Sequence, residues 1–513
     1  MAVTEVLASP PDARQDIGRR YVSAALSSGI GGGLGMVLYG LAPLLLARQL
    51  SPAEYGRYAV VMALTSLVAG LFQMGQHSAL HKMLPEYAQQ DRQRGGALLA
   101  TLVSLTSGIL LLFCAAFAGC AGWLAVTVYH DAALTSGLRF AVLLMLALTL
   151  FNLSASVVAG LQDFRAYNAA AFLRSLTFLL LAWCGAAWFG LFGALTGQLA
   201  GLLLGLALLA QRGRTLARRA FPGAIRADFS RASLRPLVAF TLPALLLTLL
   251  NLPAYWWINT LLARHQGYTE VALFSVSYAL AQLIWLLPIN LYVPVMTFLS
   301  EAQAAADQTA FARLVSDNLR AIWLVTLPLA LGAAWFSPLL LRVLFGAAYE
   351  AAAPTVSFLS LTALLMSLVG LLNTALTAAG RIWHNVAITF VWTLLFGALS
   401  WYYVPRWGAP GGGMALALSQ TVYLTMLAIY LVVGLRLRCH AAGRMTLLSL
   451  LGFAGLALAL RHLTGPVLYV SGICWLAALA GAQWRWVCGE LERRAVNKAV
   501  RGIRQAANIS WAS

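Results

Sequence analysis

The feature that most constrains this chain is a series of long apolar runs that carry almost no charge. Each run is close to the roughly 20 residues that a helix needs to cross about 30 Å of hydrocarbon. Of 513 residues, 61% are hydrophobic and only 10% are charged, which is far more apolar side chain than one soluble core can bury. The sequence therefore predicts an all-α integral membrane protein.

The apolar runs number about fourteen when counted at the length of one membrane crossing. They cover residues 22–46, 58–80, 97–126, 138–161, 168–189, 191–211, 236–262, 271–297, 320–345, 353–378, 386–405, 411–435, 446–464 and 467–487. The alternation typical of outer-membrane strands is absent, so helices are the expected spanning structure. Residues 1–21 contain acids and no apolar signal core, so we expect a short tail and no cleaved signal peptide.

Part of the sequence occurs twice. LLLARQLSPAEYGRYAVVMAL at residues 44–64 matches TLLARHQGYTEVALFSVSYAL at residues 260–280 in one ungapped register. Three weaker pairs follow at nearly the same offset: Leu84 and Glu86 with Leu299 and Glu301, Ala159-Gly160 with Ala379-Gly380, and Gly190 and Gly193 with Gly408 and Gly411. Because six spans per copy is an even number, the repeat predicts two like-oriented six-helix lobes related by an axis along the membrane normal.

This repeat gives an expected domain organisation. We expect a cytoplasmic tail at 1–21, an N-lobe at 22–211 (spans one to six), a basic cytoplasmic linker at 212–235, a C-lobe at 236–435 (spans seven to twelve), spans thirteen and fourteen at 436–488, and a basic cytoplasmic tail at 489–513. Two lobes that rock around a shared central cavity form a typical transporter architecture.

Basic residues predict which way the chain faces. Most of the 34 Lys and Arg residues lie in the tails and the even-numbered connections, which places both termini in the cytoplasm. The largest groups are Arg212, Arg214, Arg218, Arg219, Arg226, Arg231 and Arg235 in the linker and Arg493, Arg494, Lys498, Arg501 and Arg504 in the tail. Orientation and attraction to anionic lipid explain them. The net charge of +18 does not indicate nucleic-acid binding, since no soluble domain shapes a groove.

One cation stands well inside an apolar run. Arg174, in YNAAAFLRSLTFLLLAW, follows Arg165 by nine residues and lies roughly 9 to 13 Å below the cytoplasmic surface. Such a charge faces protein or water and is a candidate substrate-binding residue, with snorkelling to the interface as the alternative. Arg48 and Arg264, near Glu54 and Glu270, suggest an Arg-Glu clamp at the outer gate of each lobe; helix-end anchoring is the alternative.

The remaining polar residues of the spans are mostly neutral, because all 16 acids lie in tails, loops or span ends. Amides and aromatic rings suit sugar hydroxyls and rings, although interhelical hydrogen bonds and interface belts explain each residue better when it is taken singly. We take Asn152, Asn259, Gln282 and Asn373 as candidate substrate contacts. The six cysteines have no metal-type spacing and are interpreted as apolar packing, so we expect no metal and no cofactor.

ARQLSPAEYGRYAV after the first span and ALHKMLPEYAQQDRQRGG after the second resemble the start of the polysaccharide transporter family, the Wzx-type O-antigen and exopolysaccharide flippases. That family shares a superfamily with lipid II flippases and multidrug and toxin extruders. The resemblance implies a V-shaped, extruder-like fold and transfer of an undecaprenyl-pyrophosphate-linked oligosaccharide across a bacterial inner membrane, for O-antigen, capsule or exopolysaccharide. It also implies inner-membrane lipids and the polymerase and co-polymerase of the pathway as partners. The family's cationic cavity maps best onto Arg174.

Three other functions stay open at this point. A lipid II-type flippase fits the same architecture. A multidrug and toxin extruder needs a membrane-embedded acid for its coupling cation, and the spans offer none. A membrane glycosyltransferase or polymerase needs acids or large outer loops for its chemistry, whereas the outer connections here are short and hold only Glu54, Asp131, Glu270 and Glu350. We therefore expect a transporter that is not an enzyme.

Overall fold

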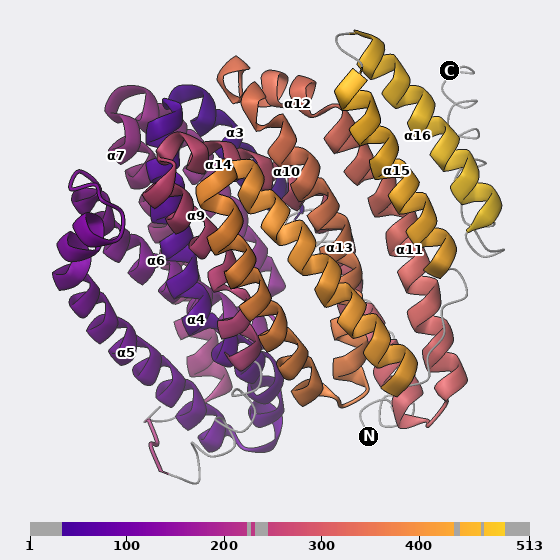
Figure 1. Ribbon diagram of the computed structural model, residues 1–513. Coiled ribbons are helices and arrows are strands. Elements are labelled where there is room, and N and C mark those ends of the chain that lie inside the picture. Colours follow the sequence, from indigo (N-terminus) through magenta and orange to yellow (C-terminus); the bar gives the residue numbers. More distant parts are fainter. Residues whose placement is uncertain (1–32, 223–226, 231–244, 435–441, 463–465, 488–513) are drawn as a thin grey trace, which may run out of the picture. The chain divides into compact units, whose positions relative to one another are not determined.

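The computed structural model describes residues 33–222, 227–230, 245–434, 442–462 and 466–487. Within these ranges the chain is helical and has no strand. The α-helices, labelled in Figure 1, are α3 (Gly33–Gln49), α4 (Pro52–Gln90), α5 (Arg92–Thr127), α6 (Leu134–Gly160), α7 (Phe164–Ala220), α9 (Pro253–His265), α10 (Tyr268–Ala304), α11 (Gln308–Trp335), α12 (Ser337–Leu344), α13 (Ala353–Ala378), α14 (Ile382–Gly434), α15 (Ala442–His462) and α16 (Pro466–Trp486). A short 3₁₀ helix, η2 (Ala347–Ala352), precedes α13.

Eleven helical segments of the described residues are long and apolar enough to cross a membrane. Two of these segments, α7 with 57 residues and α14 with 53, are each long enough for two crossings. Each is broken by a glycine with non-helical angles, Gly190 (φ 55°, ψ −134°) in α7 and Gly408 (φ 57°, ψ −136°) in α14. Counting α7 and α14 as two crossings each and the 17-residue α3 as one gives fourteen, the predicted number. Residues 22–32 and 236–244 of the predicted spans lie outside the described residues, and the span predicted at 320–345 is interrupted at Phe336, between α11 and α12.

Glycines also set how closely the two halves of α7 and α14 pack. A Cβ on Gly193 would lie within 1.8 Å of the carbonyl oxygen of Gly185, and one on Gly411 within 2.3 Å of that of Tyr403. These distances leave no room for any side chain, so the Gly-x-x-Gly motifs are where each hairpin brings backbone against backbone. The predicted boundaries between the spans at 168–189 and 191–211, and between those at 386–405 and 411–435, are thereby confirmed.

Other local geometry repeats between the halves of the sequence. Asp91 and Asp307 each accept a hydrogen bond from the backbone three residues on, as N-caps of α5 and α11. Gln162 (φ 63°) and Gly380 (φ 71°) end α6 and α13 in the left-handed conformation, and the amides of both donate to the carbonyl three residues back. This turn pairs Gln162 with Gly380. The sequence pairing of Ala159-Gly160 with Ala379-Gly380 therefore differs by two residues from the structural one, in which the two left-handed residues occupy equivalent positions.

The chain forms two compact units, Met1–Ala272 and Leu273–Ser513. In the first unit α6 packs between α4 and α7, α3 packs on α7, and α9 packs on α4. The boundary between these units, after Ala272, differs from the lobe boundary predicted from the sequence, which lies in the linker at 212–235. The division into two six-helix lobes and the symmetry axis between them stay predictions.

In the second unit α13 packs between α11 and α14, and the C-terminal helices α15 and α16 lie along α11 (Figure 1). Two indoles of α11 fix that arrangement. Trp323 donates from Nε1 to Ser449 Oγ at 2.9 Å, and Trp335 donates to the Leu468 carbonyl at 2.8 Å. The last two spans are thus integral parts of this unit.

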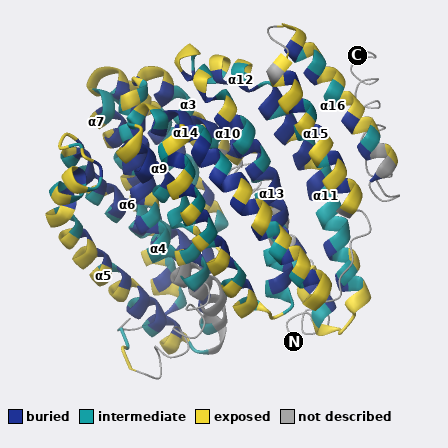
Figure 2. Ribbon diagram, in the orientation of Figure 1, coloured by how far each residue is buried: buried dark blue, intermediate teal, exposed yellow. Residues whose placement is uncertain are grey.

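Large apolar side chains face outward along several helices. On α5, Leu112 is 73% exposed and Trp123 is 63% exposed, and on α16 Ile473 is 61% exposed. Figure 2 shows exposed residues along α5, α15 and α16, beside buried ones that face their neighbours. Surfaces of this kind are stable only against lipid, as expected for a multi-pass membrane protein.

Candidate functional site

Arg174 is held between two aromatic rings inside the first unit. Its guanidinium carbon lies 4.9 Å from the ring centre of Tyr39 on α3 and 4.8 Å from that of Phe151 on α6. Gly205, in the second half of α7, makes room for this arrangement, since a Cβ there would lie 2.7 Å from the Phe151 ring. Three spans therefore converge on one cation, each ring contributing about 0.5 to 2 kcal/mol.

No carboxylate neutralises Arg174 among the ion pairs of the described residues. Its Nε atom is buried and donates no hydrogen bond in the described structure. Arg174 follows the start of α7 at Phe164 by ten residues, which is about 15 Å of helix. A half-buried cation with unused donors at this depth can bind an anion such as a phosphate.

The candidate amides differ in how much of their hydrogen bonding is already used. Asn152 follows Phe151 on α6, and its side chain donates weakly to Gln73 on α4 at 3.4 Å. Asn373 accepts from Tyr423 at 3.3 Å. Asn259 is fully buried and donates to the Tyr255 carbonyl one turn back at 2.7 Å. Gln282, in the second unit, is exposed beside a pocket.

Two further amide side chains are buried in the described residues. Gln198 and Gln420, in the second halves of α7 and α14, are 2% and 4% exposed, and in each the Oε1 atom accepts no hydrogen bond. Neither is among the candidates predicted from the sequence.

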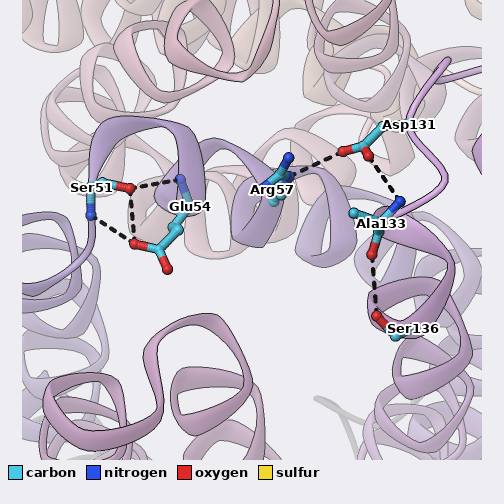
Figure 3. Close-up of polar contacts among 6 residues, drawn as sticks. All are labelled: Ser51, Glu54, Arg57, Asp131, Ala133 and Ser136. Carbon is cyan, nitrogen blue, oxygen red and sulfur yellow. Dashed lines mark hydrogen bonds and ion pairs between the residues drawn. The ribbon is translucent and has the colours of Figure 1, made fainter.

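Glu54 has a structural partner at the start of α4. Its carboxylate accepts from the Ser51 amide at 3.2 Å and from the Ser51 hydroxyl at 2.8 Å, while Ser51 caps the Glu54 amide (Figure 3). This capping box fixes the helix start. Glu270 occupies the first turn of α10 in the equivalent place. Arg48 and Arg264 are exposed at the ends of α3 and α9, so the Arg-Glu clamps stay a prediction.

An ion pair that the sequence did not predict lies close by. Arg57 on α4 donates from Nε to Asp131 at 3.1 Å, as Figure 3 shows. The Arg57 guanidinium also lies 5.1 Å above the ring of Tyr268, the first residue of α10. Its side chain is 35% exposed and that of Asp131 is 17% exposed, so water partly screens the pair. Three chain segments therefore meet at Arg57.

Close packing reinforces this junction. A Cβ on Gly56 would lie 1.9 Å from the Tyr268 carbonyl oxygen, so the backbones of α4 and the α9–α10 turn are in contact there. Nearby, the buried Tyr129 hydroxyl lies 3.2 Å from the Thr260 hydroxyl and accepts from Trp256 Nε1 at 3.2 Å. These bonds join α9 to the end of α5. We call Gly56, Arg57, Asp131 and Tyr268 the α4–α10 latch.

The two halves of α7 are also held together by an ion pair at the ends that lie far from Gly190 in the sequence. Arg212 donates from Nε to Asp163 at 2.6 Å, and Asp163 also caps the amide of Ala166. Partial burial would raise the pKa of the Asp163 carboxyl, but these hydrogen bonds outweigh it and hold the pKa below its usual range. Arg212, Arg214, Arg218 and Arg219 of the predicted linker thus belong to α7; Arg226, Arg231 and Arg235 lie outside the described residues.

One acid lies deeper in a helix than predicted. Asp317 was placed just before a span, whereas α11 begins at Gln308 and contains it. Asp317 is paired with Arg320 one turn on, and both are partly exposed, so the charge is already neutralised. Among the described residues no group of three or more His, Cys, Asp or Glu side chains could hold a metal ion.

Known proteins resemble this chain over most of its length. A family model for polysaccharide biosynthesis proteins matches residues 45–354, which is more than half of the chain. The chain belongs to this family. Two relatives bear the name EPS I polysaccharide export inner membrane protein EpsE. The one from Ralstonia nicotianae is 24% identical over 392 residues, covering 74% of this chain and 86% of the relative; the one from Ralstonia solanacearum is 27% identical over 395 residues, covering 73% and 85%.

Solved structures resemble this polysaccharide biosynthesis family protein in fold. The lipid II flippase MurJ in an inward closed conformation has a TM-score of 0.70 at 14% identity and covers 90% of this chain and 99% of its own. An inward-facing MATE family transporter of the MOP superfamily has a TM-score of 0.64 at 15% identity and covers 79% and 95%. At such low identity these likenesses establish the fold alone, and the fold is the predicted extruder-like helical architecture.

Proposed function

We propose that this protein is a flippase that moves undecaprenyl-pyrophosphate-linked oligosaccharide units across the bacterial inner membrane for surface polysaccharide synthesis. The observation that carries the proposal is the Arg174 cluster: an unneutralised cation with a buried, unused donor, where α3, α6 and α7 converge. A pyrophosphate is the charged part of such a lipid, and the guanidinium fork matches phosphate oxygens. The export role in the relatives' names supports the same substrate class.

Arg174 has a further property that suits a passing substrate. Its rings at 4.9 and 4.8 Å fix the guanidinium plane but satisfy none of its N–H groups. A pre-positioned donor set binds an anion with little loss of side-chain entropy. Asn152 in the first unit and Asn373 and Gln282 in the second offer amides for sugar hydroxyls; Asn259 has less capacity, because its amide donates within its own helix.

The α4–α10 latch would act as the outer gate. We place both termini in the cytoplasm, which puts Arg48, Glu54, Arg264 and Glu270 with the latch on the periplasmic side. Alternating access requires contacts that are stable in one state and can be broken in the other. The partly exposed Arg57–Asp131 pair is of that kind, since such pairs contribute at most about 1 kcal/mol. In this assignment the polymerase and co-polymerase of the pathway receive the product.

Two other transport functions have less support. A lipid II-type flippase shares the fold, but the family and the named relatives concern exported polysaccharide. A multidrug extruder would need an unpaired acid within the spans, whereas Asp317 of α11 is paired with Arg320.

Deleting the gene and measuring the lipid-linked sugar pool by mass spectrometry tests the proposal. We expect complete oligosaccharide units to accumulate on the lipid while surface polymer is lost. Truncated units would indicate a glycosyltransferase instead. An unchanged pool with raised sensitivity to cationic dyes would indicate an extruder.

A further inference from the structure

Three polar side chains in the second unit form a chain of hydrogen bonds that ends at a candidate substrate contact. Tyr423 of α14 donates to Asn373 Oδ1 of α13 at 3.3 Å, and its hydroxyl oxygen lies 2.7 Å from the hydroxyl of Thr389. Tyr423 is 2% exposed and Thr389 is fully buried, whereas Asn373 is partly exposed. We call Thr389, Tyr423 and Asn373 the tyrosine relay, because it leads from the interior of the unit to an accessible amide.

The direction of these bonds follows from the number of hydroxyl protons. Thr389 also lies 2.7 Å from the Asn385 carbonyl, but that carbonyl already accepts the Thr389 amide within α14. The Thr389 proton is therefore available to the Tyr423 oxygen, and the single Tyr423 proton is available to Asn373. Because this bond occupies Oδ1 of Asn373, the two N–H donors of that amide are left over. No hydrogen bond within the described residues uses them.

Aromatic packing holds the Tyr423 hydroxyl in place. Trp392 stacks on the Tyr423 ring, with the ring centres 5.4 Å apart and 25° between the planes, and it also stacks on Phe396 at 5.6 Å. Trp392 is itself buried. The Tyr423 ring cannot turn away without disrupting this stack, so its hydroxyl meets Asn373 at a fixed point.

The first sequence repeat lacks the tyrosine relay. In the register of the two helix breaks, Asn373, Thr389 and Tyr423 correspond to Ala155, Ala171 and Gly205. Helices packed in this order therefore do not require the two hydroxyls and the amide. Gly205 instead leaves room beside Arg174, whose counterpart in the same register is Trp392. At one place in the repeat, the first unit thus has a cation and the second has a neutral relay.

The orientation of the Asn373 amide decides what it can bind. A free amide can rotate and offer either its oxygen or its nitrogen, but here Tyr423 holds the oxygen and leaves the N–H donors. Uncharged N–H donors match the hydroxyl and ring oxygens of a sugar, whereas a phosphate is bound more strongly by a cation such as Arg174. The relay therefore suits the neutral part of a lipid-linked oligosaccharide.

We infer that Tyr423 is a positioning residue for sugar recognition, which holds Asn373 so that its amide donates to an oxygen of the sugar. The inference rests on the proposed function, in which Asn373 is a sugar contact. It adds Tyr423, supported by Thr389, to the site. It also narrows the group that Asn373 recognises to a hydrogen-bond acceptor.

Binding measurements on the purified full-length protein test this assignment. The two probes are undecaprenyl pyrophosphate without sugar and the lipid-linked oligosaccharide extracted from the deletion strain, and the readout is the ratio of their affinities. We expect wild type to bind the glycosylated probe more tightly. Tyr423→Phe keeps the ring stack and removes the hydroxyl, so it should lower this ratio roughly three- to tenfold, as one lost hydrogen bond does. A purely structural role would lower the midpoint of thermal unfolding and leave the ratio unchanged.

Further variants separate the parts of the tyrosine relay. Thr389→Val should lower the ratio less than Tyr423→Phe, because Tyr423 can still donate to Asn373. Asn373→Asp keeps an acceptor for Tyr423 but has no N–H group, so it should lower the ratio as far as Asn373→Ala. In an Asn373→Ala background, Tyr423→Phe should cause no further loss. Tyr430→Phe, at a partly exposed tyrosine two turns further along α14, is the matched control and should keep the wild-type ratio.

The outcomes separate the inference from the proposed function. If wild type binds neither probe, the flippase proposal fails and the inference fails with it. If wild type binds both probes equally, Asn373 contacts no sugar and the inference alone is wrong. An unchanged ratio in Tyr423→Phe, or a further loss in the double variant, would overturn the positioning role. A wild-type ratio in Asn373→Asp would overturn the assignment of Asn373 as a donor.

Discussion

Gly190 and Gly408 have the same backbone conformation, with φ 55° and ψ −134° in the first and φ 57° and ψ −136° in the second. Each divides one long helix into two membrane spans, and each is followed three residues later by a glycine in backbone contact with the preceding span. Such a conformation is accessible to glycine and strained for other residues. The relationship gives physical meaning to a repeat that is weak at the level of residue identity.

Replacing either glycine should destabilise the fold. Gly190→Ala and Gly408→Ala each place a Cβ on a backbone with positive φ, at a cost of about 1 to 3 kcal/mol. Thermal unfolding in detergent should show lower midpoints for both. Gly397→Ala, in the same helix as Gly408 but with open space around it and no positive φ, should be neutral or slightly stabilising. Equal midpoints for Gly408→Ala and Gly397→Ala would show that the break tolerates a side chain.

Arg174 should be needed for transport rather than for insertion. Arg174→Ala removes the cation and both ring contacts, so export of lipid-linked sugar should fall at least tenfold at equal membrane abundance. Arg174→Lys should restore only part of it, because an ammonium lacks the planar fork. Arg165→Ala, an exposed cation at the end of the same helix, is the matched control and should keep export near wild type. Normal polymer output from Arg174→Ala would remove this residue from the site.

The Arg57–Asp131 pair should hold the outer gate closed. Thr260→Cys, in a background without other cysteines, can report opening of the gate. Thr260 is only 6% exposed, so a thiol there should react with a reagent in water only when the gate opens. Asp131→Asn and Arg57→Gln should each raise its labelling by an impermeant maleimide about two- to fivefold, in keeping with about 1 kcal/mol or less for such a pair. The charge exchange R57D with D131R should return labelling toward the starting rate. Unchanged labelling in both single variants would mean that the pair is not part of a gate.

The Asp163–Arg212 pair predicts a pH dependence of stability. Because folding lowers the pKa of Asp163, its stabilisation is fully present above the carboxyl's usual value of 3.8 and is lost as pH falls through the lowered value. Asp163→Asn should therefore lower the free energy of unfolding by about 0.5 to 1 kcal/mol at neutral pH. The difference from wild type should shrink below pH 4. Arg214→Gln, an exposed neighbour of Arg212, should show no such pH dependence; a difference that persists in acid would contradict the ion-pair account.

Sequence reasoning recovered the fold because hydrocarbon thickness fixes the length of every span. It found the breaks at Gly190 and Gly408 through their spacing, and Arg174 through its isolation in an apolar run. It missed the pairing of Arg57 with Asp131, because the two are 74 residues apart and look like ordinary helix-end charges until the fold brings them together. The rings that hold Arg174, and the pocket beside Gln282, depend on side-chain packing between spans, which no spacing rule reports.

Reconstitution tests the central claim most directly. Purified protein is placed in liposomes that contain the lipid-linked oligosaccharide from the deletion strain, and an impermeant oxidant of sugars measures how much of the lipid is accessible. We expect wild type to expose the pool beyond the outer-leaflet fraction, with Arg174→Ala far slower and Arg165→Ala unchanged. Accessibility that stays at the outer-leaflet fraction with folded wild-type protein would contradict the flippase assignment.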